Sequence, residues 1–133
     1  MGAFFGALIG NGSGGSAGGG FAGAAIAADL PAGPSGDFDP GGTPPWPGTV
    51  NAPYGRLFLT LAGDATLGGL KAGLDGQQVA LTVSGGNLTL LNLNGSVPAD
   101  EFQIGVGDAL VADGGTLNMT YTAGTLDKWV VSL

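Results

Sequence analysis

The chain has 133 residues, a net charge of −7, and neither cysteine nor histidine. These values fit one small domain without disulfides, and they exclude histidine-dependent triads and zinc hydrolysis within this chain. Ten acidic side chains against three basic ones leave no electrostatic footprint for nucleic acid or an anionic membrane surface, so neither partner is expected. Only 10% of the residues are charged, which is typical of a protein packed among copies of itself or on a larger particle.

The first 55 residues are rich in glycine and proline and contain no lysine or arginine. Glycine loses the most backbone entropy on ordering, and most apolar residues here are alanine, so self-burial cannot offset that cost. We therefore expect residues 1–55 to form an extended arm that is ordered only by contacts with partners. The larger apolar side chains of this arm are its predicted partner-contact anchors: Phe4, Phe5, Leu8, Ile9, Phe21, Ile26 and Trp46.

Three parts of the arm allow other interpretations. The apolar run 3–9 is too short to span a bilayer and lacks the basic flank of a secretory signal. The glycine-rich stretch 11–20 lacks the buried strand, helix and lysine of a phosphate-binding loop, which favours a flexible linker. Trp46 lies in a proline-rich run, and it either folds back onto the following domain as a lid or anchors in a neighbouring subunit. The sequence leaves both roles for Trp46 open.

Residues 56–133 alternate apolar and polar side chains with a period of two, which is typical of β-strands. Glycine-containing turn signals separate the runs, and the apolar phase slips between Leu90 and Leu91, which suggests a β-bulge. Phe102, Ile104 and Val106 are expected to form one set of inward-facing side chains. We predict an all-β domain, an antiparallel sandwich or barrel, over residues 56–133. Its expected core consists of Leu57, Leu59, Val79, Leu81, Phe102, Ile104, Leu117, Met119 and Trp129.

Carboxylates are the main titratable side chains left for chemistry. Asp100 and Glu101 are adjacent, so on a strand they point to opposite faces and do not form a facing acid pair. The other aspartates beside glycines or at loop edges have the positions of turn-stabilising residues and lack the spacing of a calcium loop. No catalytic residue, cofactor or metal site is therefore predicted. The aspartates of this second group are Asp64, Asp75, Asp108 and Asp113.

The strand and turn pattern of residues 56–133 resembles a known class of proteins. The runs 106–111, 114–121 and 127–131 resemble the closing strands of small β-domains in structural proteins of tailed bacteriophages, which include tail fibres, head fibres and capsid decoration proteins. The runs 76–81 and 87–90 resemble the middle of the same unit. The resemblance implies a non-enzymatic virion protein on the outer surface of the capsid or tail.

The resemblance also implies partners. Such phage domains are typically trimers, and a small core without disulfide or metal independently favours oligomerisation. Decoration proteins of this class clamp neighbouring capsid subunits with an extended N-terminal arm, so a capsid decoration or cement protein bound to the major capsid protein is the leading hypothesis. The alternative is a short fibre or receptor-binding module that stacks glycans on exposed rings of Trp46, Tyr54 or Trp129. A cement protein would bury these rings at protein contacts.

Overall fold

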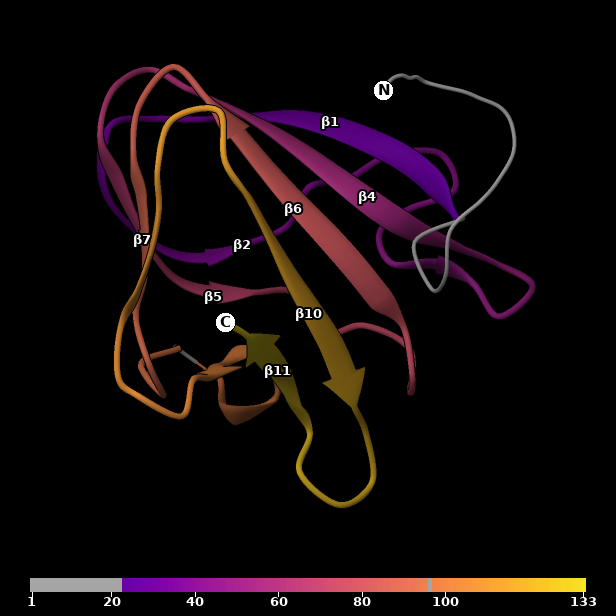
Figure 1. Ribbon diagram of the computed structural model, residues 1–133. Helices are drawn as coiled ribbons and strands as arrows, with labels where there is room; N and C mark the ends of the chain where they lie inside the picture. The colour runs from indigo at the N-terminus through magenta and orange to yellow at the C-terminus, as the bar shows by residue number, and fades with distance from the viewer. Residues whose placement is uncertain (1–22, 96) are drawn as a thin grey trace.

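Two β-sheets packed face to face make up the computed structural model, which describes residues 23–95 and 97–133 (Figure 1). A 3-10 helix, η2 (Pro98–Asp100), precedes β8. The larger sheet contains, in spatial order, β1 (Ala24–Leu30), β4 (Ala52–Leu61), β6 (Gln78–Ser84), β10 (Thr116–Thr122), β11 (Lys128–Ser132) and β8 (Phe102–Gln103), with β3 (Gly48–Thr49) paired to β4. The smaller sheet contains β2 (Gly33–Phe38), β5 (Ala65–Leu70), β7 (Leu88–Leu90) and β9 (Ala109–Val111).

Three strands of the larger sheet each continue around a corner into a strand of the smaller sheet, and we call each such pair a rung. The rungs are β1 with β2, β4 with β5, and β6 with β7, and neighbouring rungs are parallel in both sheets. In the larger sheet, for example, Leu57 of β4 is in register with Ile26 of β1 and Leu81 of β6. The described chain therefore begins as three turns of a parallel coil.

The strands that follow the third rung on each sheet, β9 and β10, run in the opposite direction. β9 pairs antiparallel with β7, and β10 pairs antiparallel with β6. β11 then returns antiparallel to β10 and parallel to β8. Short strands therefore close one side of both sheets, whereas the first rung, β1 and β2, forms the edge on the other side.

Side chains at each corner accept hydrogen bonds from the backbone of the next corner along the sheet. Asp64 Oδ1 accepts a hydrogen bond from the Asn87 N–H at 3.0 Å, and Asn87 Oδ1 accepts one from the Asp113 N–H at 2.9 Å. Gly85 and Gly114 have φ angles of 93° and 83°, which glycine adopts without a Cβ clash. The glycine turns at these places are thus corners between the sheets. Asp113 Oδ1 accepts from the Gly85 N–H at 3.0 Å, so Asp64 and Asp113 both have the structural role expected for them.

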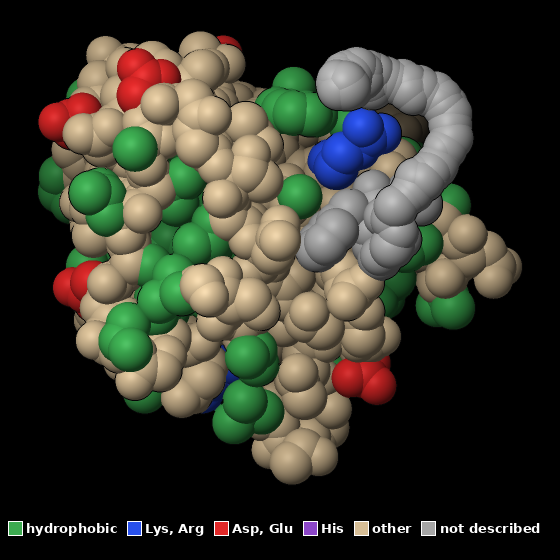
Figure 2. Space-filling model, in the orientation of Figure 1, with side chains coloured by type: hydrophobic (Ala, Val, Ile, Leu, Met, Phe, Trp, Pro, Cys, Tyr) green, Lys and Arg blue, Asp and Glu red, His purple; other side chains and the backbone are tan. Residues whose placement is uncertain are grey.

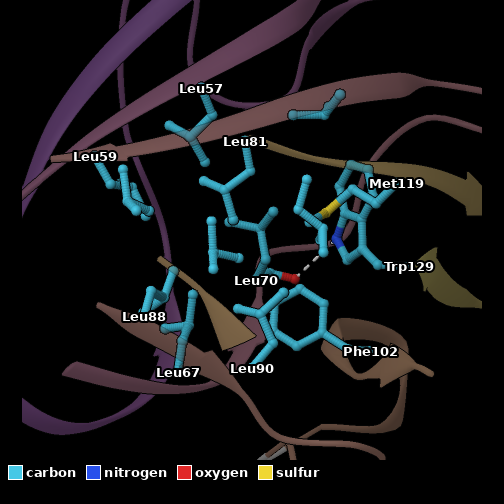
Figure 3. Close-up of a cluster of buried hydrophobic side chains, with 14 of the residues drawn as sticks. Leu57, Leu59, Leu67, Leu70, Leu81, Leu88, Leu90, Phe102, Met119 and Trp129 are labelled. Atoms are coloured by element: carbon cyan, nitrogen blue, oxygen red, sulfur yellow. Dashed lines mark hydrogen bonds between the residues drawn. The ribbon is translucent and has the colours of Figure 1, made fainter. Parts of the chain in front are cut away.

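Apolar side chains from both sheets meet in a single core (Figure 3). Each fully buried leucine contributes about 1.5–3 kcal/mol relative to an exposed one. Nine of the core positions were predicted from the alternating pattern, and all nine are buried. Leu57, Leu59 and Leu81 of the larger sheet face Leu67, Leu88 and Leu90 of the smaller one, with Leu70, Phe102, Met119 and Trp129 at one end.

The all-β prediction is confirmed, with three corrections of detail. The sheets are mixed rather than antiparallel, because the turn within each rung is a corner that leads to the other sheet and not a hairpin. Val106 is 81% exposed, because it lies in a turn after Ile104. Strand β7 ends at Leu90, where a β-bulge before Leu91 was expected. None of these corrections affects the nine residues predicted to form the core.

The domain boundary expected after residue 55 falls inside β4. Residues 24–38 form the first rung, and Ile26, Leu30, Trp46 and Tyr54 belong to the core. An arm ordered only by partners is therefore wrong for residues 23–55, which are ordered by contacts within their own chain. The small alanine and glycine side chains that argued against folding instead allow close approach to β4: a Cβ on Gly55 would lie 2.9 Å from the backbone N of Gly23.

Candidate functional site

The aromatic side chains that a glycan-binding protein would expose are packed together inside this chain. Trp46 stacks on Tyr54 with ring centroids 6.1 Å apart and planes 5° apart, and it lies 6.0 Å from Trp129. Tyr121 meets Trp129 edge to face at 5.1 Å. Tyr54, Trp46 and Trp129 are 7%, 2% and 0% exposed. None of these three rings is available for stacking on a sugar.

Hydrogen bonds fix the cluster at the start of the loop after β5. The Trp46 Nε1–H donates to the Lys71 carbonyl at 2.9 Å, and the Trp129 Nε1–H donates to the carbonyls of Leu70 and Lys71 at 3.1 and 3.2 Å. Buried Gln77 donates from Nε2 to the Tyr54 carbonyl at 2.7 Å. Because a buried polar group costs free energy unless it is paired, these bonds are part of the fold. Trp46 is thus a lid on its own domain.

The predicted partner-contact anchors separate into two groups. Ile26 is 8% exposed and Trp46 is 2% exposed, so both bury their side chains in the chain's own core. Neither has a surface to offer a partner, which corrects their predicted role. The remaining anchors lie outside the described residues: Phe4, Phe5, Leu8, Ile9 and Phe21.

Asp37 of β2 and Asp100 of η2 form a carboxyl pair that the sequence did not predict. Asp37 Oδ2 accepts from the Val97 N–H at 3.3 Å, and Asp100 Oδ1 accepts from the Ala72 N–H at 2.8 Å. Burial raises the pKa of Asp100, and the hydrogen bond and negative charge of Asp37 raise it further, whereas the Ala72 N–H and Lys71 act in the opposite direction. The pair ties β2 to the loops around η2, which is a structural role.

Glu101, the residue after η2, pairs with a basic side chain. Its Oε1 lies 2.7 Å from Lys128 Nζ in the only salt bridge found among the described residues. Within residues 23–95 and 97–133, no three His, Cys, Asp or Glu side chains are arranged to hold a metal ion. The same residues contain no helix long and apolar enough to cross a membrane.

The edge strand β1 has backbone groups without a partner strand in the described part of the chain. Its neighbour on one side is β4, and no described strand lies on the other side. An open edge is a template for pairing with another strand, and natural proteins usually block it with proline, lysine or a very short strand. β1 is seven residues long and contains neither proline nor lysine. It is therefore the candidate functional site of the described chain.

The outer face of the larger sheet adjoins this edge and is almost uncharged. Figure 2 views this face, on which most side chains are neutral and Asp29 and Arg56 are among the few charged ones. Phe58, 40% exposed, is flanked in register by Ala27 of β1 and Thr82 of β6. Thr82 in turn shares a 2.8 Å hydrogen bond with Thr116 of β10. Small neutral side chains of this kind allow a second protein surface to approach closely.

Comparisons with protein-family models, with curated proteins and with solved structures give no match for this chain. The candidate site therefore depends on the geometry alone. Sequence reasoning missed the β1 edge because it did not predict β1 as a strand. The alternation of Ile26 and Leu30 with Ala25, Ala27 and Asp29 was the available signal.

Proposed function

We propose that this chain is a non-enzymatic structural protein that works by association with other protein subunits, as a decoration or cement protein of a tailed-phage capsid. The observation that carries the proposal is the unblocked edge of β1 beside an outer sheet face with few charged side chains. A protein that stays alone in solution normally blocks such an edge and carries more surface charge. The virion setting comes from the resemblance of residues 56–133 to phage β-domains.

The chemistry of the described surface agrees with a role in attachment. The paired carboxyl groups of Asp37 and Asp100 accept hydrogen bonds from the chain's own backbone. The major capsid protein and further copies of this chain are the proposed partners, with the trimer expected from the resemblance as the proposed assembly. Many weak contacts on one particle add up to tight attachment through avidity.

The fibre or receptor-binding alternative depended on exposed aromatic rings. With Trp46, Tyr54 and Trp129 buried, it has lost the residues proposed to bind glycan. Phe58 is the largest exposed ring among the described residues, and its neighbours are small and neutral. The cement hypothesis is therefore the better supported of the two.

Mass spectrometry of purified virus particles from a culture that produces this chain tests the proposal. We expect the chain to sediment with particles in many copies and to appear on the outer capsid surface by electron cryomicroscopy. Density for the chain at the tail tip would favour the fibre alternative. Its complete recovery in the particle-free fraction would contradict both hypotheses.

A further inference from the structure

We infer that β1 binds β1 of a second copy of this chain, antiparallel across a two-fold axis at Ala27. The inference deepens the proposed function, on which it rests for the use of this edge in assembly, by naming the partner and the register. It concerns contact between two chains in solution, and because a two-fold contact joins only two copies, it is separate from the three-fold contact of the proposed trimer. It is therefore tested separately from attachment to a particle.

The direction of the backbone groups on β1 follows from one hydrogen bond. The Ala62 N–H donates to the Leu30 carbonyl at 3.1 Å, so the Leu30 carbonyl points toward β4. Successive residues of a strand direct their N–H and C=O groups to opposite sides. Ile26, Ala28 and Leu30 therefore bond to β4, and the backbone groups of Ala25, Ala27 and Asp29 face the open edge.

This alternation defines a self-complementary register. When two β1 strands run antiparallel around Ala27, Ala27 lies opposite its own copy and Ala25 lies opposite the second copy's Asp29. Each of these opposed pairs can exchange two backbone hydrogen bonds, as antiparallel pairs of this type do. The exposed side chains on either side of the axis are alanines, so no bulky group keeps the strands apart. The pairing satisfies every backbone group that the edge presents from residue 25 to residue 29.

Charge favours the same register. Arg56 of β4 is in register with Ala25 on the exposed face of the larger sheet. In the two-fold pairing, the second copy's Asp29 lies on the other side of Ala25, about 9.5 Å from Arg56 between Cα atoms at normal strand spacing. Arg56 can reach across the small Ala25 side chain to that carboxylate. Symmetry forms this ion pair twice.

The other edges of the two sheets are less suited to pairing. The backbone groups of Gly33 face β5, since its N–H donates to the Asp64 carbonyl at 2.9 Å. The backbone of the next residue, Pro34, therefore faces the open side of β2, and proline has no N–H to donate. β8 and β9 are two and three residues long. Among the strands of the described residues, only β1 combines length, small side chains and a charge pattern that matches itself.

Cysteine cross-linking of the full-length chain tests the register, because the natural chain has no cysteine. Under mild oxidation, we expect Ala27→Cys to form a disulfide-linked dimer, since two residues opposite each other have a Cα separation of about 5.5 Å. Ala25→Cys is the matched control: it is exposed on the same face of β1, but its opposite residue is Asp29, so we expect at least tenfold less cross-linking. Equal cross-linking of both variants, or none of Ala27→Cys, would overturn the inference. An absence of Ala27→Cys cross-linking is the result expected if another part of the chain or another protein covers this edge.

Exchanging the charges of Arg56 and Asp29 provides a second test of the register. Arg56→Asp should weaken dimerisation by tenfold or more in sedimentation equilibrium, and the double variant Arg56→Asp with Asp29→Arg should restore it. Failure of the double variant to restore a weakened dimer would overturn the register. If the chain attaches to particles but β1 does not cross-link, this inference is contradicted and the proposed function stands. If β1 cross-links but the chain is absent from particles, the proposed function is contradicted and this inference stands.

Discussion

The two strands of the first rung, β1 and β2, lie at the same side of the molecule but end their sheets in different ways. β2 presents Pro34 to the outside, and its Asp37 is tied to Val97 of the loop before η2. β1 presents three residues with small or acidic side chains and no such block. One rung thus protects the smaller sheet from further pairing and leaves the larger sheet open. The difference indicates that the open edge is a feature of β1 itself, and not a general consequence of how this fold ends.

Removing the Trp46 side chain should have the largest effect on the free energy of unfolding. It tests whether the segment after β2 belongs to the core. Trp46→Ala removes a nearly fully buried ring that contacts Tyr54 and Trp129, and we expect a loss of about 3–5 kcal/mol in the free energy of unfolding. Urea denaturation measures this loss. Phe58→Ala is the control, since its ring is 40% exposed, and should cost less than about 1 kcal/mol.

If Trp46→Ala does not fold, Trp46→Phe supplies the measurement, with an expected loss smaller than that of the alanine variant. A Trp46 variant as stable as the natural chain would show that residues before β4 contribute little to the core. The comparison of β1 with β2 would then lose its basis, because neither strand would be held firmly.

Gly55→Ala should loosen β1 while leaving β2 in place. The new Cβ would lie 2.9 Å from the backbone N of Gly23 and 3.1 Å from its Cα, so β1 must shift, at a cost of about 1–3 kcal/mol. Gly105→Ala is the matched control, because its Cβ would meet nothing within 4 Å. Hydrogen exchange should accelerate in β1 of the Gly55 variant only. Equal acceleration in both strands would contradict the separate roles assigned to them.

Introducing proline at the edge would give β1 the block that β2 already has. Ala27→Pro removes an N–H that faces outward, so we expect self-association to weaken about tenfold, which is about 1.4 kcal/mol. Its effect on the unfolding free energy should stay below about 1 kcal/mol. Ala28→Pro is the control, because its N–H bonds to β4, and it should destabilise the fold by about 3 kcal/mol. Similar unfolding free energies for both variants would disprove the assigned alternation.

The smallest expected effect concerns the Asp37 and Asp100 pair beside β2. The pKa of Asp100 is raised in the folded chain, so the folded state keeps a proton that the unfolded chain has lost. This group's contribution to stability is therefore greatest below its ordinary pKa of 3.8 and falls as the pH rises through the raised value. Asp100→Asn keeps an acceptor for the Ala72 N–H and gives Asp37 a donor.

We expect Asp100→Asn to raise the unfolding free energy at pH 7 by less than about 1 kcal/mol, because the pair is partly exposed to solvent. The gain should shrink at pH 3, where the natural side chain is protonated. Urea titrations at both pH values measure it, with exposed Asp39→Asn, which keeps an acceptor for the Gly41 N–H, as the control. A larger gain at pH 3 than at pH 7 would contradict the assigned direction of the pKa shift.

The sequence predicted the core of residues 56–133 well, because burial on one face of a strand imposes a period of two wherever the strand pairs. It did not distinguish corners from hairpins, since Ser84-Gly85-Gly86 has the same composition in either. It also missed β1 and β2, which contain alanine, glycine, proline and aspartate, all poor strand formers. These strands are specified by parallel pairing with β4 and β5, a non-local contact of which the alternation around Ile26 and Leu30 in β1 is only a weak local sign. The β1 edge and the pairing of Asp37 with Asp100 were hidden for the same reason.

Residue-resolved hydrogen exchange of the full-length chain at low and high protein concentration tests the central claim most directly. In dilute solution, we expect slow exchange at the amides of Ile26, Ala28 and Leu30, which bond to β4, and fast exchange at Ala25, Ala27 and Asp29. At high concentration, the second set should become protected as two β1 strands pair. Protection of all six amides at every concentration, or fast exchange of Ala27 at high concentration, would contradict an open edge that binds a second copy.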